Sequence, residues 1–215
     1  KITFPESLCV SMCDRHYGVG GYGIVLIENS EIADAAMRIF NRDGSEGRMA
    51  GNAIRCVAKY LYDNGIVQKE RMSIATASGI RTMELYTRNG KVSSVCVHMG
   101  KADLAAASLP TTLPGETIIN RPAEIGGREY AITCCSVGNP HCVVFCDRVD
   151  DVDIETVGPQ FEHAPLFPER INTEFIRVVN ASTIKMRVYE RGNGETWACG
   201  TGACAAVVAA VENGK

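Results

Sequence analysis

Several features that mark particular classes of protein are missing from this sequence of 215 residues. No apolar run approaches the ~18 residues of a membrane-spanning helix, and no signal peptide is visible. Lys and Arg form no cluster and the net charge is only −3, so nothing favours a nucleic acid or a membrane surface as partner. Apolar residues make up 46% and charged residues 22% of the chain, which is typical of a globular protein with a sizeable core.

Cysteine is abundant, but the spacing typical of a zinc site is absent. No two of the ten cysteines are arranged as C-x-x-C, so we expect no zinc site. Several lie in apolar runs such as "CVVFC", whereas secreted disulfide frameworks occur in much shorter chains. We expect most of these residues to be buried, reduced thiols in a cytoplasmic protein.

The chain contains an internal repeat. Residues 36–65 align with residues 185–214 at an offset of 149, without a gap. Seven of the 30 aligned positions are identical: Met37/Met186, Arg38/Arg187, Arg42/Arg191, Glu46/Glu195, Gly51/Gly200, Asn64/Asn213 and Gly65/Gly214. The ungapped register, with the same Asn-Gly at the end of both copies, indicates a duplication.

Each copy predicts a strand, a Gly-containing loop and a helix. The alternating "MRIF" and "MRVY" favour β-strands, and the Asn-Gly pairs are left-handed C-cap signals that end helices over 53–63 and 202–212. The second helix is almost all Ala and Val, so we expect it to be buried on every side. The other strands are expected at 22–28, 81–100 (a hairpin that turns at Asn89-Gly90), 128–138 and 142–150.

The predicted fold is therefore α+β, with two pseudo-symmetric lobes that each wrap a β-sheet or barrel around a central helix. A Pro- and Thr-rich connector at 108–116 suggests a boundary nearby, with the lobes at 1–105 and 106–215. We expect the active site in the cleft between the lobes, where the two helix starts would meet.

The helix starts suggest a chemistry. Free backbone N–H groups and the positive end of the helix dipole attract a carboxylate or phosphate, and small residues let it approach. The second helix also starts at Cys199, where we expect a lowered thiol pKa and an accessible thiolate. Cys199 could instead be only a small buried residue, but the Gly and Thr residues of "ACGTGACA" disfavour this. A thiol at both helix starts would make a two-base racemase, whereas the first copy has Ala50.

Five blocks of the chain carry a resemblance to a known family: "DRHYGVG" (14–20), "FNRDGSEGRMAGNAIRC" (40–56), "GNPHCVVF" (138–145), "FPERINTEF" (167–175) and "YERGNGETWACGTGACAA" (189–206). The chain resembles the diaminopimelate epimerases. The resemblance implies the two-lobed fold and an isomerase that interconverts LL- and meso-diaminopimelate for lysine and peptidoglycan synthesis. It also implies no cofactor, no metal, a small amino-acid substrate and a homodimer.

The resemblance assigns roles residue by residue. Cys199 matches one of two catalytic cysteines, Ala50 stands where the other is expected, and His141 and Glu190 match catalytic side chains beside the reactive centre. The positions that match substrate-binding residues are Asn41, Gly51, Asn52, Asn139, Asn172, Glu190, Arg191, Gly200 and Thr201. Of these, the two helix starts would hold the reacting α-carboxylate, and Arg191 would grip the distal carboxylate through two hydrogen bonds.

Some positions depart from the family. Besides Ala50, Tyr22 stands where the family has Asp, so a polar group near the site is lost. The family's first segment and last strands have no match, and the chain starts at Lys1 rather than Met. We therefore expect residues to be missing at both ends.

The sequence leaves several interpretations open. Ala50 is an engineered change, a natural one, or a loss for which Cys56 substitutes, although Cys56 lies six positions further along the helix. The alternatives to an impaired diaminopimelate epimerase are a racemase of another amino acid, a one-thiol lyase or isomerase, and a non-catalytic amino-acid-binding protein. The first of these is disfavoured because Arg191 would lack its carboxylate.

Overall fold

The computed structural model describes residues 2–215, which form two compact units. The first extends to Gly100 and the second is Lys101–Lys215. Isolated bridges join Asp103 to Ser136 and Ala105 to Thr117, so the residues just before the sequence-predicted boundary pair with the second unit.

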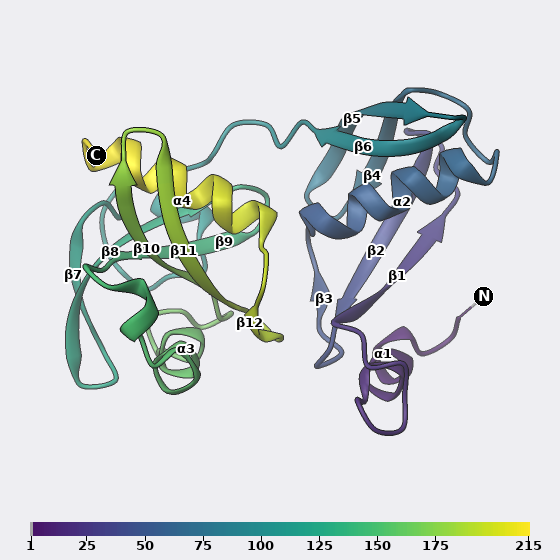
Figure 1. Ribbon diagram of the computed structural model, residues 1–215. Helices are drawn as coiled ribbons and strands as arrows, with labels where there is room; N and C mark the ends of the chain where they lie inside the picture. Colours follow the sequence, from purple (N-terminus) through teal and green to yellow (C-terminus); the bar gives the residue numbers. More distant parts are fainter. Residues whose placement is uncertain (1) are drawn as a thin grey trace. The chain divides into compact units, whose positions relative to one another are not determined.

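The first unit is a six-stranded mixed sheet with one long helix packed on it (Figure 1). Its elements are α1 (Pro5–Cys13), β1 (Gly23–Glu28), β2 (Ala35–Asn41), β3 (Glu46–Gly47), α2 (Gly51–Asp63), β4 (Arg71–Thr76), β5 (Gly79–Arg88) and β6 (Lys91–Val97). The strand order is β1-β2-β4-β5-β6, with β3 added beside β2, and β2 and β4 run parallel. Ile54, Val57 and Leu61 of α2 are buried in a core with the methionines of β4 and β5.

The second unit has the same two layers. Its elements are η1 (Ala106–Ser108), β7 (Arg121–Ile125), β8 (Arg128–Ser136), β9 (Pro140–Phe145), η2 (Val149–Asp151), α3 (Ile154–Glu162), β10 (Asn172–Asn180), β11 (Thr183–Glu190), β12 (Gly194–Thr196) and α4 (Gly200–Glu212). The sheet order is β12-β11-β10-β9-β8-β7, with only β9 and β10 parallel. Helix α4 contacts β8, β9, β10 and β11, which confirms the predicted α+β fold of two related lobes.

The repeat is visible in three dimensions. Helices α2 and α4 both have 13 residues and both end at an Asn C-cap followed by a left-handed glycine, Gly65 (φ 68°) and Gly214 (φ 66°). The ion pair Arg38–Glu46 has its counterpart in Arg187–Glu195, each at 2.7 Å. Equal positions of the two copies therefore make equal contacts, which chance similarity would not produce.

The hairpin prediction is confirmed, because Asn89 and Gly90 both have positive φ, as a two-residue type I′ turn requires. Two other expectations are wrong. The strand expected over 142–150 ends at Phe145, and the acidic stretch after it forms the short 3₁₀ helix η2. Helix α4 is not buried on every side, because Val207 and Val211 are 55% and 66% exposed.

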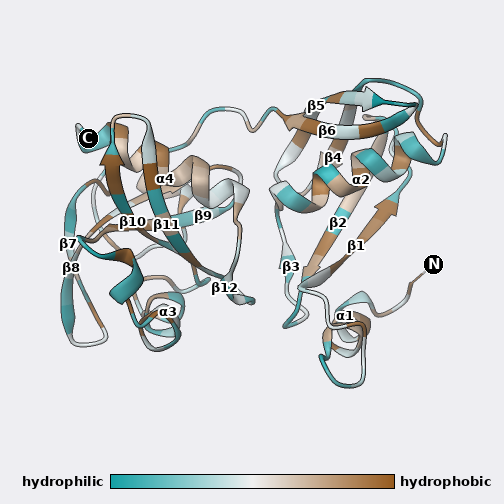
Figure 2. Ribbon diagram, viewed as in Figure 1, coloured by the Kyte–Doolittle hydropathy of each residue, from teal (hydrophilic) through white to brown (hydrophobic). Residues whose placement is uncertain are grey.

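Hydropathy shows how the two central helices differ (Figure 2). Helix α2 alternates between hydrophilic and hydrophobic residues, whereas α4 is neutral to hydrophobic along most of its length. Three of the exposed residues of α4, Ala203, Val207 and Val211, are thus apolar, so the apolar composition of this helix did not distinguish its exposed side from its buried side. None of the helices in residues 2–215 is long and apolar enough to span a membrane.

Candidate functional site

Cys199 is the N-cap residue of α4. Its backbone is extended (φ −119°, ψ 110°), and its Sγ accepts a hydrogen bond from the Gly202 N–H at 3.3 Å. The Thr201 hydroxyl lies 3.4 Å from the same sulfur, and the residue is only 8% exposed. The thiol thus sits at the positive end of a helix dipole, in a nearly dry environment.

A buried series of hydrogen bonds leads away from this thiol. The Asn139 amide donates to the Thr201 hydroxyl at 3.2 Å, and the Asn139 Oδ1 lies 3.0 Å from His141 Nε2. On the other side of the ring, His141 Nδ1 lies 2.7 Å from Oε1 of Glu174. His141 and Glu174 are fully buried, so this is a polar network inside the core.

Glu190 ends β11 and accepts a hydrogen bond from the Thr196 hydroxyl. Burial raises the pKa of its carboxyl group, and the nearby Glu174 carboxylate raises it further. The Thr196 hydrogen bond, His141 and a hydrogen bond with Cys199 act in the opposite direction. Glu190 is therefore a carboxylate in contact with the thiol, with a raised affinity for a proton.

The expectation of a lowered Cys199 pKa is wrong. Burial raises the pKa of the thiol to about 12, and the Glu190 and Glu174 carboxylates add to this rise. Hydrogen bonds from Thr201 and Gly202 favour the thiolate, but they do not compensate for burial and two negative neighbours. Cys199 is accordingly a neutral thiol at neutral pH.

Asn172 and Arg191 lie beside this centre and contact each other. The Asn172 side chain donates to the Pro140 carbonyl at 2.7 Å and accepts from the Arg191 N–H at 3.0 Å. The Arg191 guanidinium donates to the Glu169 carbonyl at 3.1 Å. These bonds fix the loop after β11 against β9.

In the first unit, Ala50 is the N-cap of α2, as Cys199 is of α4. Its backbone is extended (φ −143°, ψ 111°), and its methyl side chain makes no capping hydrogen bond. The Arg55 guanidinium instead folds back onto the helix start, where it donates to the Gly51 carbonyl and the Asn52 side chain. The start of α2 therefore has small side chains and the positive charge of Arg55, and position 50 has no group that could exchange a proton.

Two other first-unit residues named by the sequence lie near the ends of strands. Asn41 ends β2, and its amide donates to the Ser45 hydroxyl at 3.1 Å. Tyr22 precedes β1 and is 48% exposed, with the Arg15 guanidinium 5.3 Å from its ring centre. Neither side chain contacts the start of α2 through a hydrogen bond that would fix its role.

The second unit thus brings several of the predicted residues together: Asn139, His141, Glu190, Cys199 and Thr201, with Gly200 next in sequence and Asn172 and Arg191 alongside. Sequence reasoning missed Glu174 and Thr196. A single Glu within the strand-like run "NTEFIRVV" was the only available signal for Glu174.

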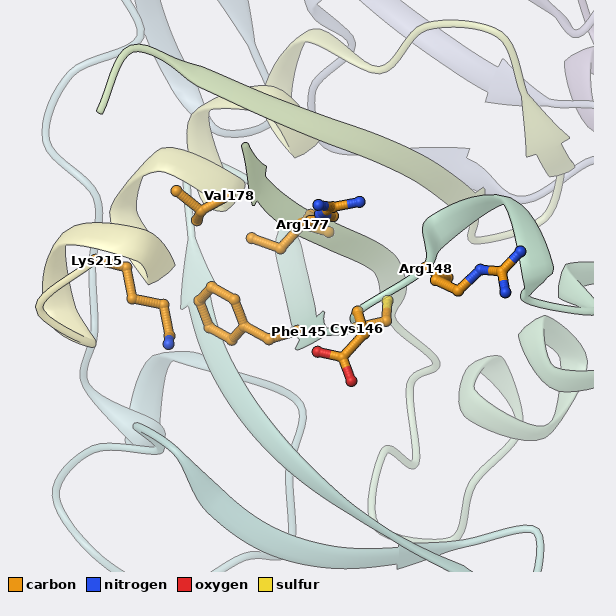
Figure 3. A pocket seen from close by; sticks show the side chains of 8 residues that line it. Phe145, Cys146, Arg148, Arg177, Val178 and Lys215 are labelled. Atoms are coloured by element: carbon orange, nitrogen blue, oxygen red, sulfur yellow. The ribbon is translucent and has the colours of Figure 1, made fainter. Parts of the chain in front are cut away.

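A separate pocket lies at the opposite end of α4 (Figure 3). Arg148, Arg177 and Lys215 line it together with Phe145, and Lys215 Nζ lies 5.3 Å from the phenyl ring centre. It contains none of the residues predicted for the site. Within residues 2–215, no three His, Cys, Asp or Glu side chains are grouped so that they could hold a metal ion.

Comparison with known proteins identifies the family. The sequence model named "Diaminopimelate epimerase" matches residues 2–105 and 133–215. This chain belongs to the diaminopimelate epimerase family. It is 53% identical over 211 residues to the diaminopimelate epimerase of Pelotomaculum thermopropionicum, covering 98% of this chain and 75% of that protein. It is 49% identical over 210 residues to the enzyme of Acetivibrio thermocellus, with the same coverage.

Solved structures with low sequence identity share the fold of this epimerase-family chain. A probable proline racemase from Agrobacterium radiobacter K84 superposes with a TM-score of 0.74 at 16% identity, over 98% of this chain and 66% of its own. A hydroxyproline epimerase from Agrobacterium vitis gives 0.72 at 15% identity, over 95% and 64%. The fold is therefore the one used by these two proteins.

Proposed function

We propose that this chain binds diaminopimelate and exchanges the proton on its reacting α-carbon through Cys199, with Ala50 impairing inversion. The observation that carries the proposal is the Cys199 thiol at the N-cap of α4, in contact with Glu190, in a chain of the diaminopimelate epimerase family. The two relatives described above are named diaminopimelate epimerase, which supports diaminopimelate as the substrate.

The start of α4 can stabilise the negative charge that forms when the α-proton is removed. Its first backbone N–H groups and dipole stabilise the α-carboxylate, and they stabilise the added charge when the α-carbon becomes a carbanion. Because Cys199 is a neutral thiol, it must lose its proton before it can act as a base, and Glu190 is the adjacent carboxylate that can accept it. The thiolate then removes the α-proton, and reprotonation from the same thiol regenerates the starting epimer.

Position 50 determines what this chain cannot do. A two-base inversion needs a second acid on the opposite face of the α-carbon, and a methyl group at the N-cap of α2 has no exchangeable proton.

We assign the distal end of the substrate to Arg191, with Asn172 beside it, because a guanidinium matches a second carboxylate. An amino acid without that carboxylate would leave the arginine without this partner.

The test is exchange in heavy water. One epimer should gain deuterium at the reacting carbon while its stereochemistry stays nearly unchanged, and the other should exchange far more slowly. Ala50→Cys should raise the inversion rate by about 10²–10⁴-fold, the usual contribution of a general acid or base. Ala50→Ser is the matched control, because its hydroxyl is similar in size but far less acidic, and it should not restore inversion. Rapid inversion by the unaltered chain, or no gain from Ala50→Cys, would refute the proposal.

A further inference from the structure

Glu174 is a buried carboxylate to which neither the sequence nor the proposed reaction assigns a role. It lies in β10 and is fully buried, and its Oε1 accepts from His141 at 2.7 Å. Its other oxygen, Oε2, is buried without a hydrogen-bond partner in residues 2–215. A buried carboxylate oxygen without a partner is costly, so packing alone does not explain why a charged side chain is retained here.

The backbone of α4 leaves space for this carboxylate. A Cβ atom added to Gly202 would lie 2.6 Å from Glu174 Oε1 and 3.2 Å from Cys199 Sγ. Gly202, the second glycine of the "CGTG" motif, is thus needed because Glu174 Oε1 occupies the space that a Cβ atom would take. The start of α4 is consequently in close contact with both the Glu174 carboxylate and the Cys199 thiol.

The geometry also orients the imidazole. Both ring nitrogens of His141 face acceptor oxygens, because Nδ1 lies against Glu174 Oε1 and Nε2 against Asn139 Oδ1, so each nitrogen donates a hydrogen bond. Asn139 then donates to Thr201, whose hydroxyl lies against Cys199. Removing the carboxylate would leave the His141 ring without the hydrogen bond that holds its Nδ1 side.

We propose that Glu174 is a positioning residue of this site: its buried carboxylate fixes the orientation of His141 and holds the proton on its Nδ1, and through Asn139 and Thr201 it fixes the environment of the Cys199 thiol. The proposal rests on the proposed function only in taking Cys199 as the reacting group. The titratable groups that face Glu174 are His141 on β9, Cys135 on β8, Glu190 on β11 and Cys199 at the start of α4, whereas Cys142 of β9 lies on the other face of the sheet.

Three variants of the full chain separate positioning from packing. Glu174→Gln keeps an acceptor oxygen but removes the charge, whereas Glu174→Leu removes both. Thr173→Val is the matched control, because Thr173 is the neighbouring buried residue of β10 and its hydroxyl also lacks a partner in the described chain. Thermal unfolding by circular dichroism establishes that each variant is folded.

The first readout is ¹⁵N NMR of the His141 ring without any substrate. We expect a ring that is protonated on both nitrogens in the unaltered chain and in Thr173→Val. In Glu174→Leu, Nδ1 has no acceptor, so the ring should keep its proton on Nε2 alone, and its N–H should exchange faster with water. An unchanged ring in Glu174→Leu would overturn the proposal.

The second readout is the alkylation rate of Cys199, followed by peptide mass spectrometry at fixed pH. Removing a neighbouring negative charge lowers the pKa of the Cys199 thiol. A pKa that is lower by one gives tenfold more thiolate, but the thiolate is a weaker nucleophile, so the alkylation rate should rise by about threefold. Glu174→Gln should therefore react faster than Thr173→Val. Equal rates would overturn the proposal, and this test remains decisive if Glu174→Leu does not fold. Both readouts omit diaminopimelate, so failure of the proposed function would leave them unaffected.

Discussion

At the scale of single residues, the loop after β11 holds Arg191, the residue that we propose for the distal carboxylate of the substrate. The Arg191 backbone is held by Asn172, and the guanidinium is oriented by the Glu169 carbonyl. A side chain held in place beforehand loses less entropy when it binds a carboxylate. Arg191 is therefore placed to contribute affinity for a ligand with two carboxylates.

We predict that Arg191→Ala weakens diaminopimelate binding by about 1.5–3 kcal/mol, the value of a charge-assisted hydrogen bond. Isothermal titration calorimetry measures this change directly. Arg177→Ala, which removes an exposed arginine from β10 of the same unit, is the control and should leave affinity unchanged. Equal affinities of the two variants would show that the distal carboxylate binds elsewhere.

Cys199 gives a second prediction at this scale. Because burial and two carboxylates raise its pKa to about 12, the thiolate is scarce near neutral pH. Iodoacetamide at pH 8 should modify the exposed Cys56 and Cys96 well before Cys199, and Cys199 modification should accelerate with rising pH toward about 12. Peptide mass spectrometry at a series of times resolves the three sites. Cys199 reacting first would contradict the high pKa.

At the scale of elements, the start of α4 combines helix propensity with a steric limit. Gly within a helix ordinarily costs about 1 kcal/mol relative to Ala, so Gly→Ala usually stabilises an exposed helix. At Gly202 the new methyl group would displace Glu174 Oε1, a hydrogen-bonded atom in the core. Two opposite effects therefore meet at one residue.

We predict that the steric effect is larger and that Gly202→Ala destabilises the protein by about 1–3 kcal/mol, as overpacking does. Ala203→Gly, at the exposed neighbouring position, should cost no more than about 1 kcal/mol, from propensity alone. Urea unfolding of both variants gives the comparison. A more stable Gly202→Ala variant would mean that the carboxylate moves freely.

Some elements could be predicted from sequence and others could not. Helices α2 and α4 and the β5–β6 hairpin carry local signals, namely Asn-Gly caps and a two-residue turn. Strand β10 begins with buried polar residues, Asn172, Thr173 and Glu174, which hide its apolar character. Helix α1 has little amphipathic pattern, since "PESLCVSMC" places polar and apolar residues on all sides. Burial of α4 depends on which neighbours cover it, and composition cannot specify that.

The site shows the same division. Cys199, Ala50 and Arg191 were found because they lie in motifs contiguous in sequence. Glu174 was not, because its contact with His141 depends on the parallel pairing of β9 and β10, in which Asn172 lies opposite His141. The high pKa of Cys199 likewise depends on burial and on carboxylates from other strands, whereas the helix start alone suggested a low one.

At the scale of the whole molecule, buried thiols couple stability to pH. Burial is the largest cause of a raised pKa for Cys9 (about 11), Cys135 (about 12) and Cys199 (about 12), and it also raises the pKa of Cys142. The folded protein therefore holds these protons more tightly than the unfolded chain does. Their stabilising effect is complete below about pH 9 and is lost as pH rises through about 11 to 12.

We predict that the free energy of unfolding falls steadily above about pH 9. Cys135→Ala should lower stability at neutral pH because it leaves a cavity, but its loss of stability with rising pH should be less steep. Urea titrations at pH 8, 9.5 and 10.5 give both slopes. Identical slopes would show that Cys135 does not contribute to the alkaline loss.

The edge of β11 away from β10 is only partly paired. Strand β12 pairs only with Val188–Glu190, so residues 183–187 have a backbone edge without a strand partner in the described chain. The exposed Val207 and Val211 of α4 lie in a groove with Ile184 and Met186 of this strand. Such an edge is a template for adding another strand. The equivalent edge of β2, in the first copy of the repeat, pairs in parallel with β4 beside the short β3. A strand that adds to β11 at this edge should therefore run parallel to it.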